Sequence, residues 1–196
     1  MRTPPIHIGM GLLADGLKIA EFLDNTTMSN PIFTHVTDDR AAMVDISDKD
    51  AITRRAVATG RIVLRRETIA AINAGSVEKG NVLATARIAA IMAVKETPST
   101  IPMCHQIPIT GIDVNFEVAS DAIHAFVEVK SVGRTGVEME ALSGVSVALL
   151  TIWDMVKSAE KDESGNYPHT AIMDIRVVEK VKYRAHQTGD PDPRNR

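Results

Sequence analysis

Cysteine and aromatic residues are scarce in this chain. Cys104 is the one cysteine in 196 residues, which excludes an intramolecular disulfide framework and favours a reducing cytoplasm. Aromatic residues make up 4% of the chain while hydrophobic residues reach 44%, so the core has to be built from aliphatic side chains. The length suits one domain of ordinary size with short extensions.

Long apolar runs and an excess of one charge sign are also missing. The formal net charge is −3 and the pI is about 6.1, which argues against a general nucleic-acid binder or membrane-surface binder. We find no run of eighteen apolar residues and no leader with a small-residue cleavage site, so we expect a soluble, cytoplasmic protein. This balance is compatible with a local cationic pocket for a phosphorylated small molecule.

The chain divides into three parts by composition. Residues 1–40 combine turn-forming residues with scattered glycines, and we expect a loosely packed N-terminal extension there. Residues 41–187 carry the regular apolar patterns of a folded domain. Residues 188–196 are polar and are expected to form a disordered tail.

Periodicity within the domain predicts an α+β sandwich, with one mostly antiparallel sheet and helices on one face. Apolar and polar residues alternate on both sides of Ser120-Asp121, which is typical of an antiparallel hairpin. Thr97-Pro98 is expected to end a helix, because proline disfavours helical geometry at the residue before it. The proline-rich stretch 101–110 is expected to be a loop. The expected helices are 51–59, 67–73, 81–95 and 137–157, and the expected strands are 43–47, 61–64, 109–118, 123–132 and 172–178.

The longest predicted helix is expected to be buried on more than one side. Its apolar residues recur at steps of three and four and so form one face: Leu142, Val145, Leu149, Ile152 and Val156. Small residues lie between them, which lets another helix approach closely. Thr135 and Glu138 have the spacing of a capping box at the start of this helix.

Four clusters carry groups that can do chemistry, and each also has a structural explanation. The clusters are Cys104-His105, Lys79 at a helix start, Glu138-Met139-Glu140 at the next helix start, and Asp154 with Lys157. A single Cys-His pair offers too few ligands for zinc. A solvated lysine, a helix-capping carboxylate and an exposed ion pair would account for the other three clusters.

Asp154 and Lys157 lie three residues apart and face the same side of the helix. Their apolar neighbours, including Trp153, indicate a partly enclosed pair, and an enclosed lysine can exchange protons near neutral pH. Glu140 precedes Asp154 by fourteen residues, or roughly 20 Å along the axis at about 1.5 Å per residue. One small pocket cannot contain both carboxylates, so a single site that uses both requires two subunits. We therefore expect an oligomer with sites at a subunit interface.

Five motifs follow one another along the domain: MVDIS (43–47), KGNVLATARIA (79–89), IPMCH (101–105), TGVEMEAL (135–142) and LLTIWDMVK (149–157). In this order and spacing they closely resemble the molybdenum cofactor biosynthesis protein C family, the cyclic pyranopterin monophosphate synthases. The resemblance covers about residues 41–181. It implies a ferredoxin-like α+β sandwich, assembled as a homohexamer (a trimer of dimers) with sites at subunit interfaces.

The resemblance also implies a reaction and a set of site residues. Members convert (8S)-3′,8-cyclo-7,8-dihydroguanosine 5′-triphosphate into cyclic pyranopterin monophosphate and pyrophosphate, a lyase reaction that depends on acid/base catalysis. The implied catalytic residues are Asp154, Lys157 and Lys79. The implied substrate-binding residues are Met103, Cys104, His105, Glu138, Met139, Glu140 and Arg54. No tightly bound cofactor and no metal site on the protein is implied, and Mg²⁺ would accompany the substrate triphosphate.

Two departures from the family pattern concern the phosphate side of the site. Gln106 stands where many members have proline after the histidine, and the ending of the type KSGGKSG is absent, although Lys180 and Lys182 can supply positive charge. Two alternatives to the enzyme stay open. One is a non-catalytic paralogue that binds a nucleotide or pterin in a regulatory or scaffolding role. The other is a structural oligomer whose charged groups form interface ion pairs.

Overall fold

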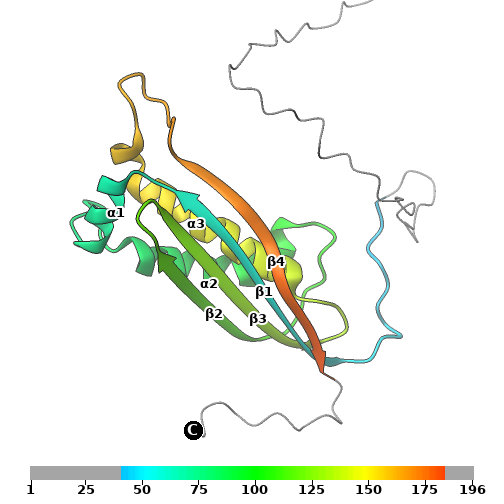
Figure 1. Cartoon of the computed structure of the whole chain (residues 1–196). Helices are drawn as coiled ribbons and strands as arrows, with labels where there is room; N and C mark the ends of the chain where they lie inside the picture. The colour runs from blue at the N-terminus through cyan, green and yellow to red at the C-terminus, as the bar shows by residue number, and fades with distance from the viewer. Residues whose placement is uncertain (1–40, 184–196) are drawn as a thin grey trace, which may run out of the picture. The chain divides into compact units, whose positions relative to one another are not determined.

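The structure, a computed structural model, describes residues 41–183, so the predicted extension (1–40) and tail (188–196) lie outside it. Four strands form one antiparallel sheet in the order β2-β3-β1-β4 (Figure 1). The strands are β1 (Ile52–Val63), β2 (Ile109–Val118), β3 (Ala122–Gly133) and β4 (Ala171–Tyr183). The helices are α1 (Arg66–Asn73), α2 (Val82–Thr100) and α3 (Glu138–Glu160). The arrangement confirms the predicted ferredoxin-like α+β fold.

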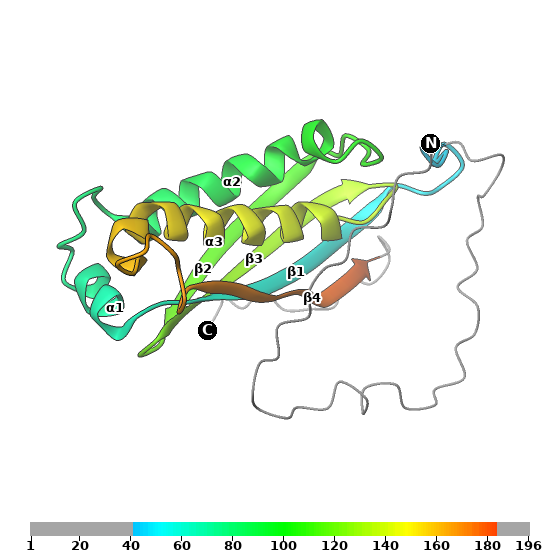
Figure 2. The ribbon, with the colours of Figure 1, turned by 90° about the horizontal axis from the view of Figure 1, so that it is seen from above.

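The two long helices, α2 and α3, lie side by side on one face of the sheet, as Figure 2 shows. The core between helices and sheet is aliphatic, as the composition predicts. Its fully buried side chains include Ile62, Ile123, Val127, Leu149 and Ile152. The motifs at the two ends of α3 are thereby held against a rigid support.

Gly144 allows α3 to pack closely against both α2 and β3. A Cβ atom at this position would lie 2.9 Å from a side-chain carbon of Val94 and 2.9 Å from one of Val127. A side chain here would overpack the core and push the helix outward. This is the close helix approach that the small residues of the sequence predict.

Strand β1 contradicts the sequence-based prediction, which divided it into a helix at 51–59 and a strand at 61–64. Buried and partly exposed residues alternate along β1, with Ala56 and Ala58 fully buried. Alanine favours helices in isolated peptides, but β1 pairs with β3 on one side and with β4 on the other. Pairing and burial outweigh the local propensity. Residues 43–47, which were also predicted as a strand, form none.

Helix α2 extends beyond its predicted end at Thr97-Pro98. Pro98 lies inside the helix, which reaches Thr100. The proline removes the backbone donor that would reach the carbonyl of Val94, and the turn is tied instead by the Thr97 hydroxyl, which donates to the carbonyl of Ala93 at 2.9 Å. The N–H of Ile101 donates to the carbonyl of Thr97 at 2.8 Å and closes the last turn. The prediction was wrong because Thr97 is buried, so packing holds this turn in place.

The hairpin is confirmed by β2 and β3, which pair from Ile109 to Val118. The loop at 101–110 is confirmed up to Pro108, and β4 is longer than the predicted strand 172–178. Among residues 41–183, α3 alone is long and apolar enough to cross a membrane, with a mean hydropathy of 1.4. Half of that apolar window is buried within the chain, which is typical of the core helix of a folded domain.

Candidate active site

Ionisable residues form two clusters at opposite ends of α3. At the C-terminal end, the Asp154 carboxylate lies between two lysines. Its Oδ1 is 2.8 Å from Lys157 Nζ, and its Oδ2 is 2.8 Å from Lys79 Nζ in the loop between α1 and α2. Lys79 Nζ also donates to the backbone carbonyl of Asp154 at 2.7 Å. The three residues predicted to be catalytic therefore meet at one point, although 75 positions separate Lys79 from Asp154.

Ion pairing favours the charged forms of Asp154 and Lys157. Hydrogen bonds from Lys157 and then from Lys79 lower the pKa of Asp154 to about 2. The Asp154 carboxylate in turn raises the pKa of Lys157. The predicted partial enclosure of this pair is wrong for the single chain, because the side chains of Asp154 and Lys157 are 57% and 48% exposed. Attraction between the charges, not desolvation, therefore sets the direction of both pKa shifts.

At the N-terminal end of α3, a cavity of about 190 Å³ opens between the helix start and the loop that follows α2. Six of the seven residues predicted to bind substrate line it: Met103, Cys104, His105, Glu138, Met139 and Glu140. The two segments come together because α3 runs back alongside α2 (Figure 2). The fold thus gathers these residues around one space.

Glu140 is the most buried carboxylate in this cavity, with 3% of its surface exposed. Burial raises the pKa of Glu140, and the negative charge of Glu138 raises it further. A hydrogen bond from its own backbone N–H lowers it, but by less than burial raises it. Its Oε2 atom has no hydrogen-bond partner among residues 41–183. Buried polar atoms are rarely left unpaired, so this oxygen is available to a bound molecule.

Glu138 does not form the capping box predicted with Thr135. Helix α3 starts after Val137, and no side chain caps it. The Glu138 carboxylate instead pairs with Lys180 of β4. Burial alone would raise the pKa of Glu138, but the hydrogen bonds from Lys180 and from the backbone outweigh it and lower the pKa. The contact between Lys180 and Glu138 leaves no local signal in the sequence, where Lys180 is expected only to compensate for the missing lysine-rich ending.

Cys104 and His105 lie on the loop side of the cavity. Burial and then the charge of Glu140 raise the pKa of Cys104, so the thiol stays protonated at neutral pH. Asp45, in the MVDIS segment, has a pKa lowered mainly by hydrogen bonds from Ser47 and further by the charge of His105. In the described part of the chain, no group of three or more His, Cys, Asp or Glu is placed to hold a metal ion.

Arg54, the seventh predicted binding residue, does not line the cavity but holds the turn that precedes α3. It is 9% exposed, and its Nε donates to the carbonyl of Gly133 at 2.9 Å while Nη2 donates to that of Arg134 at 3.1 Å. A second cavity, of about 250 Å³, lies beside this turn and has Arg134 in its wall. It shares three residues with the first cavity: His105, Ile107 and Thr135. The two cavities therefore adjoin.

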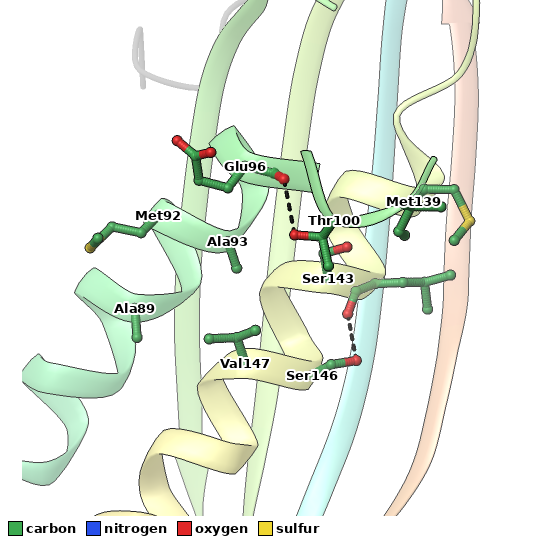
Figure 3. A pocket seen from close by; sticks show the side chains of 11 residues that line it. Ala89, Met92, Ala93, Glu96, Thr100, Met139, Ser143, Ser146 and Val147 are labelled. Atoms are coloured by element: carbon green, nitrogen blue, oxygen red, sulfur yellow. Dashed lines mark hydrogen bonds between the residues drawn. The ribbon is translucent and has the colours of Figure 1, made fainter. Parts of the chain in front are cut away.

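The two ionisable clusters do not meet within one chain, because α3 is continuous from Glu138 to Glu160. Glu140 and Asp154 are fourteen residues apart, or roughly 20 Å along the helix. An apolar groove of about 490 Å³ lies between α2 and α3, with Met92, Met139 and Val147 around it (Figure 3). Ile88, Met92 and Leu150, also on these helices, are 62%, 60% and 57% exposed.

Comparison with known proteins finds relatives over most of the chain. The MoaC family model matches residues 43–182. A protein of Methanosarcina acetivorans is 69% identical over 150 residues, which cover 76% of this chain and 95% of the relative. A protein of Pyrococcus abyssi is 61% identical over 149 residues, which cover 76% of this chain and 94% of the relative. Both relatives are named probable cyclic pyranopterin monophosphate synthase.

Proposed function

The chain belongs to the MoaC family, and from this we propose that it is itself a cyclic pyranopterin monophosphate synthase. The proposed reaction converts (8S)-3′,8-cyclo-7,8-dihydroguanosine 5′-triphosphate into cyclic pyranopterin monophosphate and pyrophosphate, as a lyase. The observation that carries the proposal is the cluster of Lys79, Asp154 and Lys157, in which one carboxylate orders two ammonium groups at 2.8 Å.

Acid/base catalysis is proposed for this cluster. The rearrangement of the ring system consists largely of proton transfers, which positioned lysines and carboxylates accelerate. The ammonium groups of Lys79 and Lys157 can donate protons, and the ionised Asp154 can accept one or hold the lysines in place. A second subunit that covers the cluster would desolvate Lys157 and bring its pKa down toward the range of efficient proton transfer.

The cavity at the start of α3 is proposed to hold the guanine-derived ring. The unpaired Oε2 of Glu140 can accept a hydrogen bond from the N–H groups of such a ring. The Cys104 thiol and the His105 imidazole supply further polar contacts from the loop side. Met103 and Met139 supply polarizable apolar surface for the faces of the ring.

The triphosphate is proposed to lie among the cations around the two cavities. Arg134 lines the adjoining cavity and Lys180 pairs with Glu138 beside the first one. Arg54 supports the same turn, and Lys79 and Lys157 would approach from another subunit. Charge neutralisation assists the departure of pyrophosphate. We propose no tightly bound cofactor, and Mg²⁺ would arrive with the triphosphate.

A homohexamer, built as a trimer of dimers in the cytoplasm, is the proposed assembly. The roughly 20 Å between Glu140 and Asp154 supports it, because a complete site then needs the cavity of one subunit and the lysine cluster of another. The open apolar groove between α2 and α3 also supports it, since extended exposed apolar surface marks interaction sites.

Incubation of the purified full-length chain with the cyclised dihydro-GTP tests the proposed activity. Release of pyrophosphate together with the pterin product is the expected result. Asp154→Asn should abolish both signals while the protein stays folded by circular dichroism. Substrate binding without turnover by the wild type would refute the enzyme and favour the non-catalytic binding paralogue instead.

A further inference from the structure

The face of the sheet opposite the helices contains a separate polar cavity of about 150 Å³. Its walls come from three adjacent strands, β1, β3 and β4: Thr59, Gly60, Arg61, His124, Asp174 and Arg176. Ile62 is fully buried, and a Cβ on Gly60 would meet Val145 and Leu149 of α3, so Arg61 between them points away from the helices. The sheet therefore separates this cavity from α3.

Charge is balanced at one end of this face of the sheet. Arg55 lies 2.5 Å from Glu128 on β3 and 2.5 Å from Glu179 on β4. Lys130 lies 2.9 Å from Glu128. Two cations and two carboxylates thus form a row across three strands, and each cation has an acidic partner.

Charge is not balanced in the cavity, where two guanidinium groups share one acidic residue. Arg61 Nε lies 2.7 Å from Asp174 Oδ2, and Arg176 Nη1 donates to the backbone carbonyl of Asp174 at 3.2 Å. Neither guanidinium group has another hydrogen-bond or ion-pair partner among residues 41–183. His124 stands directly opposite Arg61 in the β1–β3 register. Residues directly opposite each other on neighbouring strands lie within contact distance, so the His124 ring can add an N–H donor beside the Arg61 guanidinium group.

The backbone of β4 is distorted at the same place. Asp174 has φ of 59°, the one non-glycine residue with positive φ in the described part of the chain. The pairing of β1 with β4 shifts register between Thr59 and Arg61. Bulges of this kind turn side chains out of the regular alternation, and strained backbone is often retained at functional positions.

We propose that this cavity binds a small phosphate-type oxyanion between the guanidinium groups of Arg61 and Arg176, with the His124 ring as a third donor. Guanidinium groups bind such anions through paired N–H donors. Asp174 is neutralised by Arg61 and does not exclude the anion, while Glu117, opposite His124 on β2, does not line the cavity. The volume, about 150 Å³, is well above the roughly 10–15 Å³ that a single water molecule requires, and it admits a tetrahedral oxyanion.

The test uses inorganic phosphate and the full-length chain carrying Lys79→Ala and Lys157→Ala, which removes two cations of the lysine cluster. At low ionic strength, ³¹P NMR line broadening should show saturable binding. Arg176→Gln in this background should weaken binding at least tenfold, since a hydrogen bond to a charged group is lost. Lys130→Gln, on the same sheet face but beside Glu128, is the matched control and should bind like its parent.

A local signal identifies the place of binding. Phosphate should shift the ring resonances of His124, assigned through His124→Gln, in the parent but not in Arg176→Gln. Arg176→Lys keeps the charge without the paired donors and should bind phosphate with intermediate strength. This graded order distinguishes loss of the guanidinium group from a folding defect in Arg176→Gln. The proposal is overturned if the parent shows no saturable binding, as expected if a second copy covers this face, or if Arg176→Gln binds as well as the parent.

Discussion

Asp154 illustrates how one residue, shared by two lysines, fixes the charge state of a cluster. Its folded-state pKa of about 2 lies below the ordinary value of 3.8, because both lysines favour the carboxylate. Asp154 is therefore ionised at every pH at which an enzyme of this kind works. A pH dependence of activity near neutrality must come from other groups.

Acidification should remove the stabilising effect of this ion pair. Because the folded pKa is depressed, the contribution is present above pH 3.8 and is lost as the pH falls toward about 2. The pair is exposed, so the effect is small. Thermal unfolding between pH 6 and pH 2 should show a smaller loss of Tm for Asp154→Asn than for the wild type. Glu163→Gln, at an exposed loop position, should follow the wild type, and equal losses in all three would contradict the prediction.

Lys157→Ala should reduce kcat by roughly 10²–10⁴-fold, the usual contribution of a positioned acid or base. Folding should be unaffected, because the lysine side chain is exposed in the single chain. Lys161→Ala, one turn further and also exposed, is the matched control and should keep wild-type kcat. Steady-state release of pyrophosphate measures both. Normal turnover by Lys157→Ala would remove this lysine from the mechanism.

Glu140→Gln should stabilise the free protein and weaken substrate binding. Burial raises the pKa of Glu140 in the folded protein, so the free energy of unfolding falls as the pH rises and this buried carboxyl ionises. Glutamine does not ionise and therefore avoids this loss of stability. Loss of a hydrogen bond to a charged group should raise KM roughly 10- to 100-fold. Glu138→Gln breaks the ion pair with Lys180 and should instead lower Tm. Melting curves at pH 8 and substrate saturation curves measure both variants. A Tm below that of the wild type for Glu140→Gln would contradict the prediction.

At the scale of one element, the position of α3 depends on Gly144. Gly144→Ala places a methyl group 2.9 Å from Val94 and Val127 and should destabilise the fold by about 1–3 kcal/mol. Gly111→Ala in β2 meets only Lys130 at 3.7 Å, and it should be neutral or stabilising by about 0.4–1 kcal/mol. Urea unfolding measures both free energies. Equal stabilities would mean that α3 can shift without cost.

Local patterns predicted the elements whose residues agree with their surroundings. The β2–β3 hairpin alternates cleanly, and α3 has regular apolar spacing, so both were predicted from sequence. Strand β1 was not, because its inward residues Ala56 and Ala58 are small to accommodate the helices and therefore look helical. The pairing of Lys180 with Glu138 was not predicted either, because it is created by the fold and not by sequence spacing.

At the scale of the whole molecule, subunit mixing tests whether the two ends of α3 serve one site. His105→Ala damages the cavity, and Lys157→Ala damages the lysine cluster. If each site combines the cavity of one subunit with the cluster of another, mixed oligomers should regain about a quarter of wild-type activity, the statistical share of intact pairs. Activity of co-refolded subunits measures this recovery. If confirmed mixed oligomers recover no activity, the two ends of α3 do not combine across subunits into one site.

Lys79, Asp154 and Lys157 share one network of contacts, so their free energies cannot be divided among them. Replacing any one residue changes the surroundings of the other two, and losses measured singly should add up to more than the loss from replacing all three. The loop that carries Lys79 and the last turns of α3 therefore have to be kept together for the network to form. A redesigned protein that receives the end of α3 without that loop would have Asp154 and Lys157 but not the contact of Asp154 with Lys79.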